Sequence, residues 1–306
     1  MNAPISPQAA TPALVTAPDL PDIFPPRKPL KGLRGFLRRN VSIAIGGTLL
    51  AIIVLLAILA PYLGTTDPTA LATWKRTRVP SAEHWFGTDM LGRDIYSRVL
   101  YGARVSLTVG FAVAFFASVA GLAVGLVSGT VRWADGIIMR IIDGLMSIPP
   151  ILLAIALMAL TRGSIGNVIV AITIAEIPRV SRLVRGVVLT LREQPYVDAA
   201  IAAGTRTPGI IWRHILPNTL APMSVQATYI CASAMIVESI LSFIGAGVPP
   251  IIPSWGNIMA EGRTLWQVKP HMVFFPALFL SVTVLAVNLL GDGLRDALDP
   301  RLAKKV

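Results

Sequence analysis

The chain has 306 residues, of which 54% are hydrophobic and only 14% are charged, and its mean hydropathy of +0.68 is far above that of a soluble domain. Its formal net charge of +11 is typical of some nucleic-acid-binding proteins. The Lys and Arg residues cluster at the ends of apolar stretches, however, where they orient a membrane protein and meet anionic lipid. We therefore predict an all-α membrane protein surrounded by lipid, with no nucleic-acid partner.

The chain begins with a polar segment that contains no membrane span. Residues 1–26 are rich in Pro, Ala and Thr, without a basic start or a long apolar run, which predicts a disordered tail and not a cleaved signal peptide. Six basic residues follow between Arg27 and Arg39. We assign residues 1–40 to a basic, cytoplasmic N-terminal tail.

Six apolar stretches are long enough to cross about 30 Å of hydrocarbon. The first, 41–61, ends at a proline and is followed by a long polar outer loop over 62–103. A core over 104–292 contains the other five, and 293–306 is predicted to be a cytoplasmic tail. The five spans predicted in the core are 105–130, 136–160, 165–189, 221–244 and 272–290.

The basic residues predict the orientation of these spans. If the N-terminus is cytoplasmic, that side receives sixteen of the 27 Lys and Arg residues and the outer side nine, while Arg179 and Arg182 lie within the fourth span. Six of the outer nine lie in the long first loop or at its end, where the positive-inside rule is weak. We therefore predict that both termini are cytoplasmic.

Small residues recur every four positions in the second span, at Ala117, Gly121, Gly125 and Gly129. Small side chains at this spacing let helix backbones approach closely in lipid. General glycine enrichment in membrane helices is the other explanation. The spacing favours a tight helix contact within the core.

Five charged residues stand out within the predicted spans: Asp143, Glu176, Arg179, Arg182 and Glu238. A charge at bilayer depth costs about 2.5–3.5 kcal/mol, so each should face protein or water. The group could form a proton relay, line a polar substrate path or hold helices together, and we favour the last two. Glu238 is predicted to face a cavity, with Glu176 and Arg179 as further pathway candidates.

A patterned segment lies between the fourth and fifth spans. Residues 197–203 are mostly strong helix formers, and Gly204 can take the left-handed conformation that ends a helix. Thr207 is predicted to cap a second short helix that has Pro208 in its first turn and that Pro217 stops. The side chains predicted to form an apolar ridge facing a partner are Ile210, Ile211, His214 and Ile215.

This segment resembles the EAA signature of ABC-importer permeases, E-A-A-x3-G-x9-I-x-L-P, with Asp in place of Glu and His in place of Ile. The resemblance implies a pair of coupling helices at 195–217 that docks on an ATPase subunit. An ordinary cytoplasmic loop is the alternative. The residues expected to couple to the ATPase are Asp198, Ala199, Ala200, Gly204, Ile210, Ile211, His214, Leu216 and Pro217.

Three further segments, 84–104, 241–263 and 288–302, are similar to the dipeptide, oligopeptide and nickel branch of the same family. The first two mix Gly and Pro turns with aromatic and charged residues, which suits an ordered loop or a re-entrant segment. The resemblance implies that they face the translocation gate and a substrate-binding protein, although simple capping of the helix bundle would also explain them.

The resemblance implies a type I ABC importer permease fold, with six transmembrane helices and a MetI-like core, in a bacterial inner membrane. It implies a heterodimer with a second, homologous permease subunit, two ABC ATPase subunits and an extracytoplasmic binding protein. No lysine follows a glycine, so the chain has no Walker A loop. We expect no cofactor on this chain, which is not an enzyme; ATP and Mg would be used by the ATPase subunits.

Two other classes compete with this interpretation. The intramembrane acids would suit an ion-gradient-driven secondary transporter, but no inverted repeat or pair of broken helices is evident. An intramembrane enzyme would need metal-spaced histidines or a nucleophile with its base, and neither pattern is present. We therefore expect a permease subunit that moves di- or oligopeptides or a related solute, such as a nickel chelate or glutathione.

Overall fold

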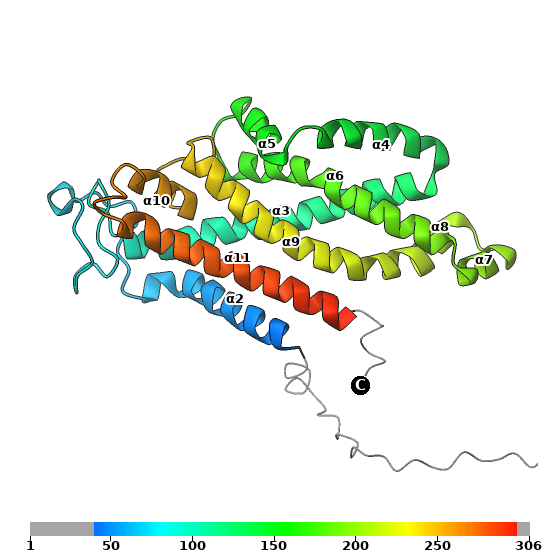
Figure 1. The fold of residues 1–306 in the computed structure, drawn as a ribbon, viewed down its shortest axis with the longest axis horizontal. Coiled ribbons are helices and arrows are strands. Elements are labelled where there is room, and N and C mark those ends of the chain that lie inside the picture. Colours follow the sequence, from blue (N-terminus) through cyan, green and yellow to red (C-terminus); the bar gives the residue numbers. More distant parts are fainter. Residues whose placement is uncertain (1–39, 299–306) are drawn as a thin grey trace, which may run out of the picture.

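The computed structural model describes residues 40–298, and over this range it contains helices and no β-strand apart from one isolated bridge between Thr88 and Asp94. The predicted tails lie outside the described residues, except for Asn40 and the helical residues 293–298. Figure 1 shows the elements in order. These are α2 (Val41–Leu59), η1 (Ala60–Tyr62), η2 (Thr73–Lys75), α3 (Ile95–Thr130), α4 (Arg132–Met146), α5 (Pro150–Ala159), α6 (Ile165–Arg192), α7 (Pro195–Ala202), α8 (Thr207–Ile210), η3 (Ile211–Ile215), α9 (Leu216–Phe243), α10 (Trp255–Gly262) and α11 (His271–Leu298).

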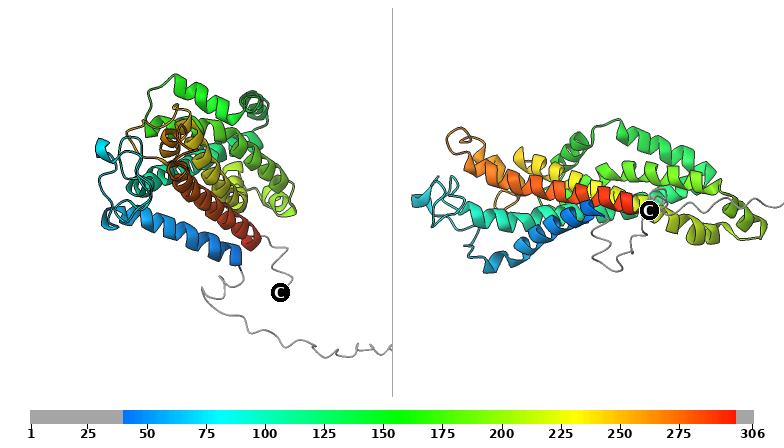
Figure 2. Two further views of the ribbon diagram at one scale, coloured as in Figure 1. Left: turned by 60° about the vertical axis from the view of Figure 1, so that its left-hand side comes forward. Right: turned by 60° about the horizontal axis from the view of Figure 1, so that its bottom comes forward.

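The long helices run side by side along the longest axis of the molecule (Figures 1 and 2). Helix α3 is central: it packs most extensively against α6 and also against α9. Helix α11 packs against both α9 and α2, so α2 lies on the outside of the bundle. The first residue of α2 and the last of α11 face the end of the molecule that carries α7 and α8 (Figure 1).

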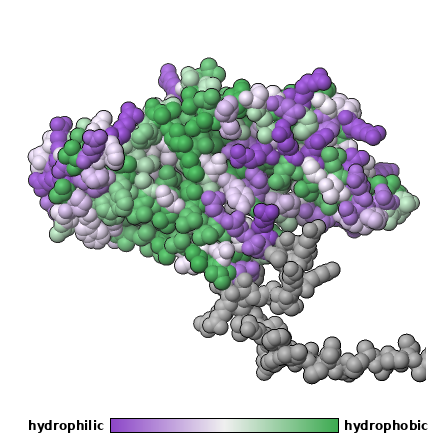
Figure 3. All heavy atoms as spheres, viewed as in Figure 1, coloured by the Kyte–Doolittle hydropathy of each residue, from purple (hydrophilic) through white to green (hydrophobic). Residues whose placement is uncertain are grey.

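Four helical segments of the described chain are long and apolar enough to cross a membrane: 41–62, α3, the continuous run 207–243, and α11. The α4–α5 pair qualifies only as a single broken span. Helix α6 has the length but carries five charged residues, which lower its apolar character. Apolar surface gathers over the middle of the molecule, between a polar end at the loop before α3 and a polar end at α7 (Figure 3).

Two of the helices differ from the predicted spans, each for a local reason. The predicted third span is not continuous, because α4 and α5 meet at a bend of 86°. Pro149 and Pro150 lie at this break, and Pro150 disfavours the helical conformation for the residue before it. The helix that contains the second span begins at Ile95, ten residues before the predicted start of the span, because the carboxylate of Asp94 caps the helix by accepting a 2.8 Å hydrogen bond from the Ser97 amide.

The predicted small-residue stripe of α3 is confirmed as a close helix contact. Ala117 and the three glycines that follow it are buried against α6. A Cβ added at Gly125 would lie 2.8 Å from the Ser181 carbonyl oxygen, and one at Gly129 would lie 2.7 Å from the Val188 Cβ. Because these distances are shorter than van der Waals contact, only glycine allows the α3–α6 approach.

Candidate coupling site and charged core

Helix α7 ends in a turn that depends on glycine. Gly204 has a φ of +81°, as predicted, and its amide donates to the Ile201 carbonyl at 2.9 Å. The Thr205 amide donates to the Ala200 carbonyl at 3.0 Å. This pair of bonds forms a Schellman motif, which satisfies the last carbonyls of α7 and reverses the chain into α8.

The second short helix does not stop at Pro217. Helix α8, the π-helical turn η3 and α9 form one continuous helical run from Thr207 to Phe243. The Leu216 amide donates to the Ile211 carbonyl, five residues back, so the wider π turn makes room for the Pro217 ring. Pro217 therefore lies in the first turn of α9, and the predicted stop is wrong.

The predicted cap of α8 is also wrong. Arg206 is the N-cap residue, and Thr207 is already helical and makes no capping hydrogen bond. Two prolines thus fall in first turns, Pro195 in α7 and Pro208 in α8, where the missing amide costs little. Both short helices are therefore started by proline and backbone geometry and not by a capping side chain.

The predicted apolar ridge faces inward. Ile210 and Ile215 are buried in the hydrophobic core of this chain, and Ile211 packs against that core. Periodicity indicated one face correctly but could not tell a face that meets a partner from one that meets the chain itself. Among the residues expected to couple, Asp198, Ala199, Gly204 and Pro217 are exposed, and Ala200, His214 and Leu216 are half-buried.

The exposed side of this site consists of other apolar residues. Trp212 is 74% exposed, Ile201 55% and Tyr196 42%. Sequence reasoning missed all three, although for Trp212 the neighbouring Arg213 was a visible signal, an aromatic residue next to a charged one in a short helix. The Asp198 carboxylate makes no ion pair within the described range. At one end of the bundle, the pair of short helices therefore offers exposed aromatic and aliphatic surface and a carboxylate without an ion pair in the described range (Figure 1).

Four of the five charged residues singled out in the predicted spans are paired. Arg182 donates to Asp143 at 2.5 Å and joins α6 to α4. Glu176 lies 3.3 Å from the Arg179 guanidinium and accepts a 3.1 Å hydrogen bond from Ser233 on α9. Glu176 is buried, whereas about half of the Arg179 side chain is exposed. The Arg182–Asp143 and Glu176–Ser233 contacts join helices, as predicted, whereas the Glu176–Arg179 pair lies within α6. A role of Glu176 and Arg179 in a pathway stays a prediction.

Glu238 is enclosed by hydroxyl groups. It has no exposed surface, and its carboxylate accepts hydrogen bonds from Ser242 at 2.8 Å and Ser106 at 3.2 Å. The Ser242 oxygen also accepts from the Val248 amide, in the loop after α9. Glu238 therefore faces a serine cage between α3 and α9 and not an open cavity as predicted, because the serines of both helices point to the same interior position.

At the opposite end from α7, a buried ionic cluster joins the two segments that the sequence singled out separately. Asp89 accepts from Arg93 at 2.7 Å and from Arg98 at 2.5 Å. Both arginines also donate to Glu261 of α10 at 2.5 Å, and Arg98 has no exposed surface. The Trp255 indole donates to the Val99 carbonyl at 3.1 Å. The loop before α3 and the short helix α10 thus form one ordered unit.

Long apolar helices, paired charges within and between them, and two exposed short helices at one end define a multi-pass membrane protein. The chain belongs to the family of binding-protein-dependent transport system inner membrane components, whose model matches residues 117–304. It is therefore an inner-membrane protein and a permease component of an ABC transporter.

Several relatives match most of the chain. A probable peptide ABC transporter permease of Sinorhizobium fredii is 53% identical over 88% of this chain and 92% of its own. The dipeptide transport system permease DppC of Alkalihalophilus pseudofirmus is 42% identical over 87% of this chain and 88% of its own. The glutathione transport system permease GsiD of Pectobacterium atrosepticum is 42% identical over 88% of this chain and 90% of its own.

Solved structures share the fold. Two structures of inward-facing conformations of the MetNI methionine ABC transporter align with TM-scores of 0.53 and 0.56, at 21% identity. Each alignment covers 66% of this chain and 96% of the other. The predicted type I importer permease fold is therefore confirmed at the level of architecture.

Proposed function

We propose that this chain is the membrane-spanning subunit of an ATP-driven importer that moves peptides, or a related small solute, into the cytoplasm. Relatives named for peptides, dipeptides and glutathione support this substrate class. ATP and Mg would be used by separate ATPase subunits, since the sequence has no Gly-Lys pair for a Walker A loop. A second permease subunit and an extracytoplasmic binding protein would complete the complex.

The single observation that carries the proposal is the exposed pair of short helices joined to two long ones. Helix α7 follows α6 after two residues, and α8 continues through η3 into α9 without a break. At 1.5 Å per residue the 37-residue run from Thr207 extends about 56 Å. A displacement of α8 by a docked ATPase would therefore move the far end of α9, where Glu238 lies.

The coupling surface in this proposal differs from the one that the motif suggested. Tyr196, Ile201 and Trp212 would enter the groove of the ATPase, with the Asp198 carboxylate as an ionic contact. The buried Ile210 and Ile215 would hold α8 and η3 against the hydrophobic core of this chain, on the side opposite the ATPase. This arrangement suits a lever, because a docking helix must be held firmly by its own subunit if it is to transmit motion.

The proposed orientation puts both termini and the short helices in the cytoplasm. The bias of Lys and Arg supports it, and so does the placement of the first residue of α2 and the last of α11 toward the α7 end (Figure 1). Alternating access requires that nucleotide and binding protein have different affinities for the inward- and outward-open states.

Purification of the tagged chain from its native membrane in mild detergent tests the proposed assembly. Mass spectrometry should find a second permease and one or two kinds of P-loop ATPase with it. Recovery of the tagged chain without any ATPase, under conditions that retain the second permease, would contradict the proposal.

A further inference from the structure

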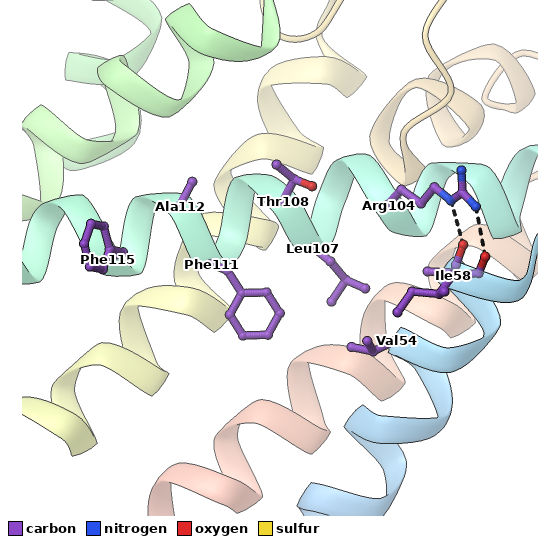
Figure 4. A pocket seen from close by; sticks show the side chains of 9 residues that line it. Val54, Ile58, Arg104, Leu107, Thr108, Phe111, Ala112 and Phe115 are labelled. Atoms are coloured by element: carbon purple, nitrogen blue, oxygen red, sulfur yellow. Dashed lines mark hydrogen bonds between the residues drawn. The ribbon is translucent and has the colours of Figure 1, made fainter.

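A groove of about 560 Å³ runs along the outside of the bundle between α2 and α3 (Figure 4). Val54 and Ile58 of α2 form one wall, and Leu107 and Phe111 of α3 project toward it. Apart from one arginine and one threonine the lining is apolar. Both helices are membrane spans, so the groove opens toward the lipid or toward a partner.

The described part of the chain leaves this groove uncovered. Phe115 is 62% exposed, Ile58 61% and Phe111 46%. The α3 residues that line it recur at helical spacing, so they form one continuous stripe. A stripe of this kind in a membrane span must be covered by something apolar.

A cation closes one end of the groove. The Arg104 guanidinium donates from Nε to the Ala57 carbonyl at 2.6 Å and from Nη2 to the Ile58 carbonyl at 3.0 Å (Figure 4). It lies 5.0 Å from the Tyr101 ring centroid. Its partners are neutral, it makes no ion pair with any residue of 40–298, and its third nitrogen, Nη1, donates to none of them. Arg104 therefore offers an uncompensated positive charge with a free donor.

The depth of this charge matches the surface of a bilayer. Helix α2 ends just beyond Ile58, and Tyr62, which follows, is 85% exposed. Tyr101 lies beside Arg104 and Tyr62 just beyond the end of α2, as aromatic residues do where a span meets the headgroups. From Arg104 to Phe115 the groove extends about 16 Å along α3, close to half of the roughly 30 Å hydrocarbon thickness.

We propose that this groove binds one phospholipid, whose phosphate contacts Arg104 and whose acyl chain lies along Leu107, Phe111 and Phe115. An apolar channel of one-leaflet length with a cation at its headgroup end has the shape and charge of a phospholipid. A helix of a partner protein would span both leaflets, about twice the length of this groove, and would need an acid of its own at Arg104. The proposal is independent of the transported substrate.

Photo-crosslinking in the assembled complex tests this site. Phe111 is replaced by the photoreactive analogue p-benzoyl-phenylalanine, membranes are irradiated, and the adduct is identified by mass spectrometry. We expect a phospholipid adduct at position 111. Its yield should fall on the order of tenfold in Arg104→Gln, as for loss of a charge-assisted hydrogen bond, and should be largely retained in Arg104→Lys, which keeps the charge. The same probe at Leu55, which is 55% exposed on α2 outside the groove, should give lipid adducts that are indifferent to Arg104.

Arg104 also ties α3 to the end of α2, so a second variant leaves its hydrogen bonds intact. Ala112→Phe fills the groove and should lower the phospholipid adduct at position 111 without changing the adduct at Leu55. An adduct with another protein at position 111 would show that a partner helix occupies the groove. A phospholipid yield that neither Arg104→Gln nor Ala112→Phe changes would show bulk lipid only. Either result overturns the proposal.

Discussion

Replacing Gly204 should weaken coupled transport through backbone strain alone. Its φ of +81° lies in the left-handed region, and a Cβ added there would meet no atom of the described chain within 4 Å. The cost is therefore conformational and not steric. For an L-residue it is roughly 1–2 kcal/mol, equivalent to a factor of about 5 to 30 in the population of the turn.

A graded series separates the turn from the side chain. Gly204→Val and Gly204→Ala should each lower ATP-dependent uptake by about fivefold or more. The loss should be larger for valine, because a β-branched residue suits φ > 0 least. Gly204→Asn should retain most activity, because asparagine tolerates the left-handed region. Uptake and ATPase activity are measured in proteoliposomes that contain the whole complex, and both are expressed per assembled complex.

Gly186→Ala is the matched control. Gly186 lies in the regular helix α6 with open space around its Cβ position, so alanine should be neutral there or slightly stabilising. Wild-type uptake by Gly204→Val would refute the reasoning. Equal losses in Gly204→Asn and Gly204→Val would refute it too, because they would point to side-chain size at the docking surface and not to the turn.

Three further predictions concern other contacts. Glu261→Gln leaves buried Arg98 with fewer acidic partners and should lower the free energy of unfolding by about 3 kcal/mol, measured by thermal or denaturant unfolding of the purified complex. Gly125→Leu should separate α3 from α6 and prevent recovery of a folded complex, measured by size-exclusion chromatography. Asp198→Lys should weaken ATPase binding, and the difference from wild type should shrink at high salt if the contact is ionic.

Matched changes separate these effects from general damage. Glu83→Gln breaks an exposed ion pair with Lys75 in the same outer loop and should leave unfolding nearly unchanged. If Glu83→Gln lowered the free energy of unfolding as much as Glu261→Gln does, this would contradict a special role of the buried cluster. Gly144→Leu, in open space on α4, should still give a folded complex. A folded complex with Gly125→Leu would show that assembly does not need the close contact between α3 and α6. If the loss of ATPase binding in Asp198→Lys did not depend on salt, this would contradict an ionic contact at Asp198.

Local causes explain what the sequence could predict. The end of α7 at Gly204 and the α3–α6 contact follow from a few neighbouring residues, one through a left-handed turn and the other through a period of four. The break between α4 and α5 was also visible, as Pro149-Pro150, but an apolar average over the whole span conceals it.

Long-range pairing and the direction of a helix face could not be predicted. Arg98 and Glu261 are 163 positions apart, and nothing in either segment names the other. The inward turn of Ile210 and Ile215 depends on where α8 packs, and the serine cage of Glu238 depends on two helices that meet only in the folded bundle.

Uptake by the reconstituted complex tests the central claim most directly. Proteoliposomes that contain the purified complex and its binding protein are given labelled peptides, with ATP or an imposed proton gradient as the energy source. We predict uptake that requires ATP on the side of the ATPase subunits and that survives a proton ionophore. Uptake without ATP that collapses with the proton gradient would contradict it and would identify a secondary transporter.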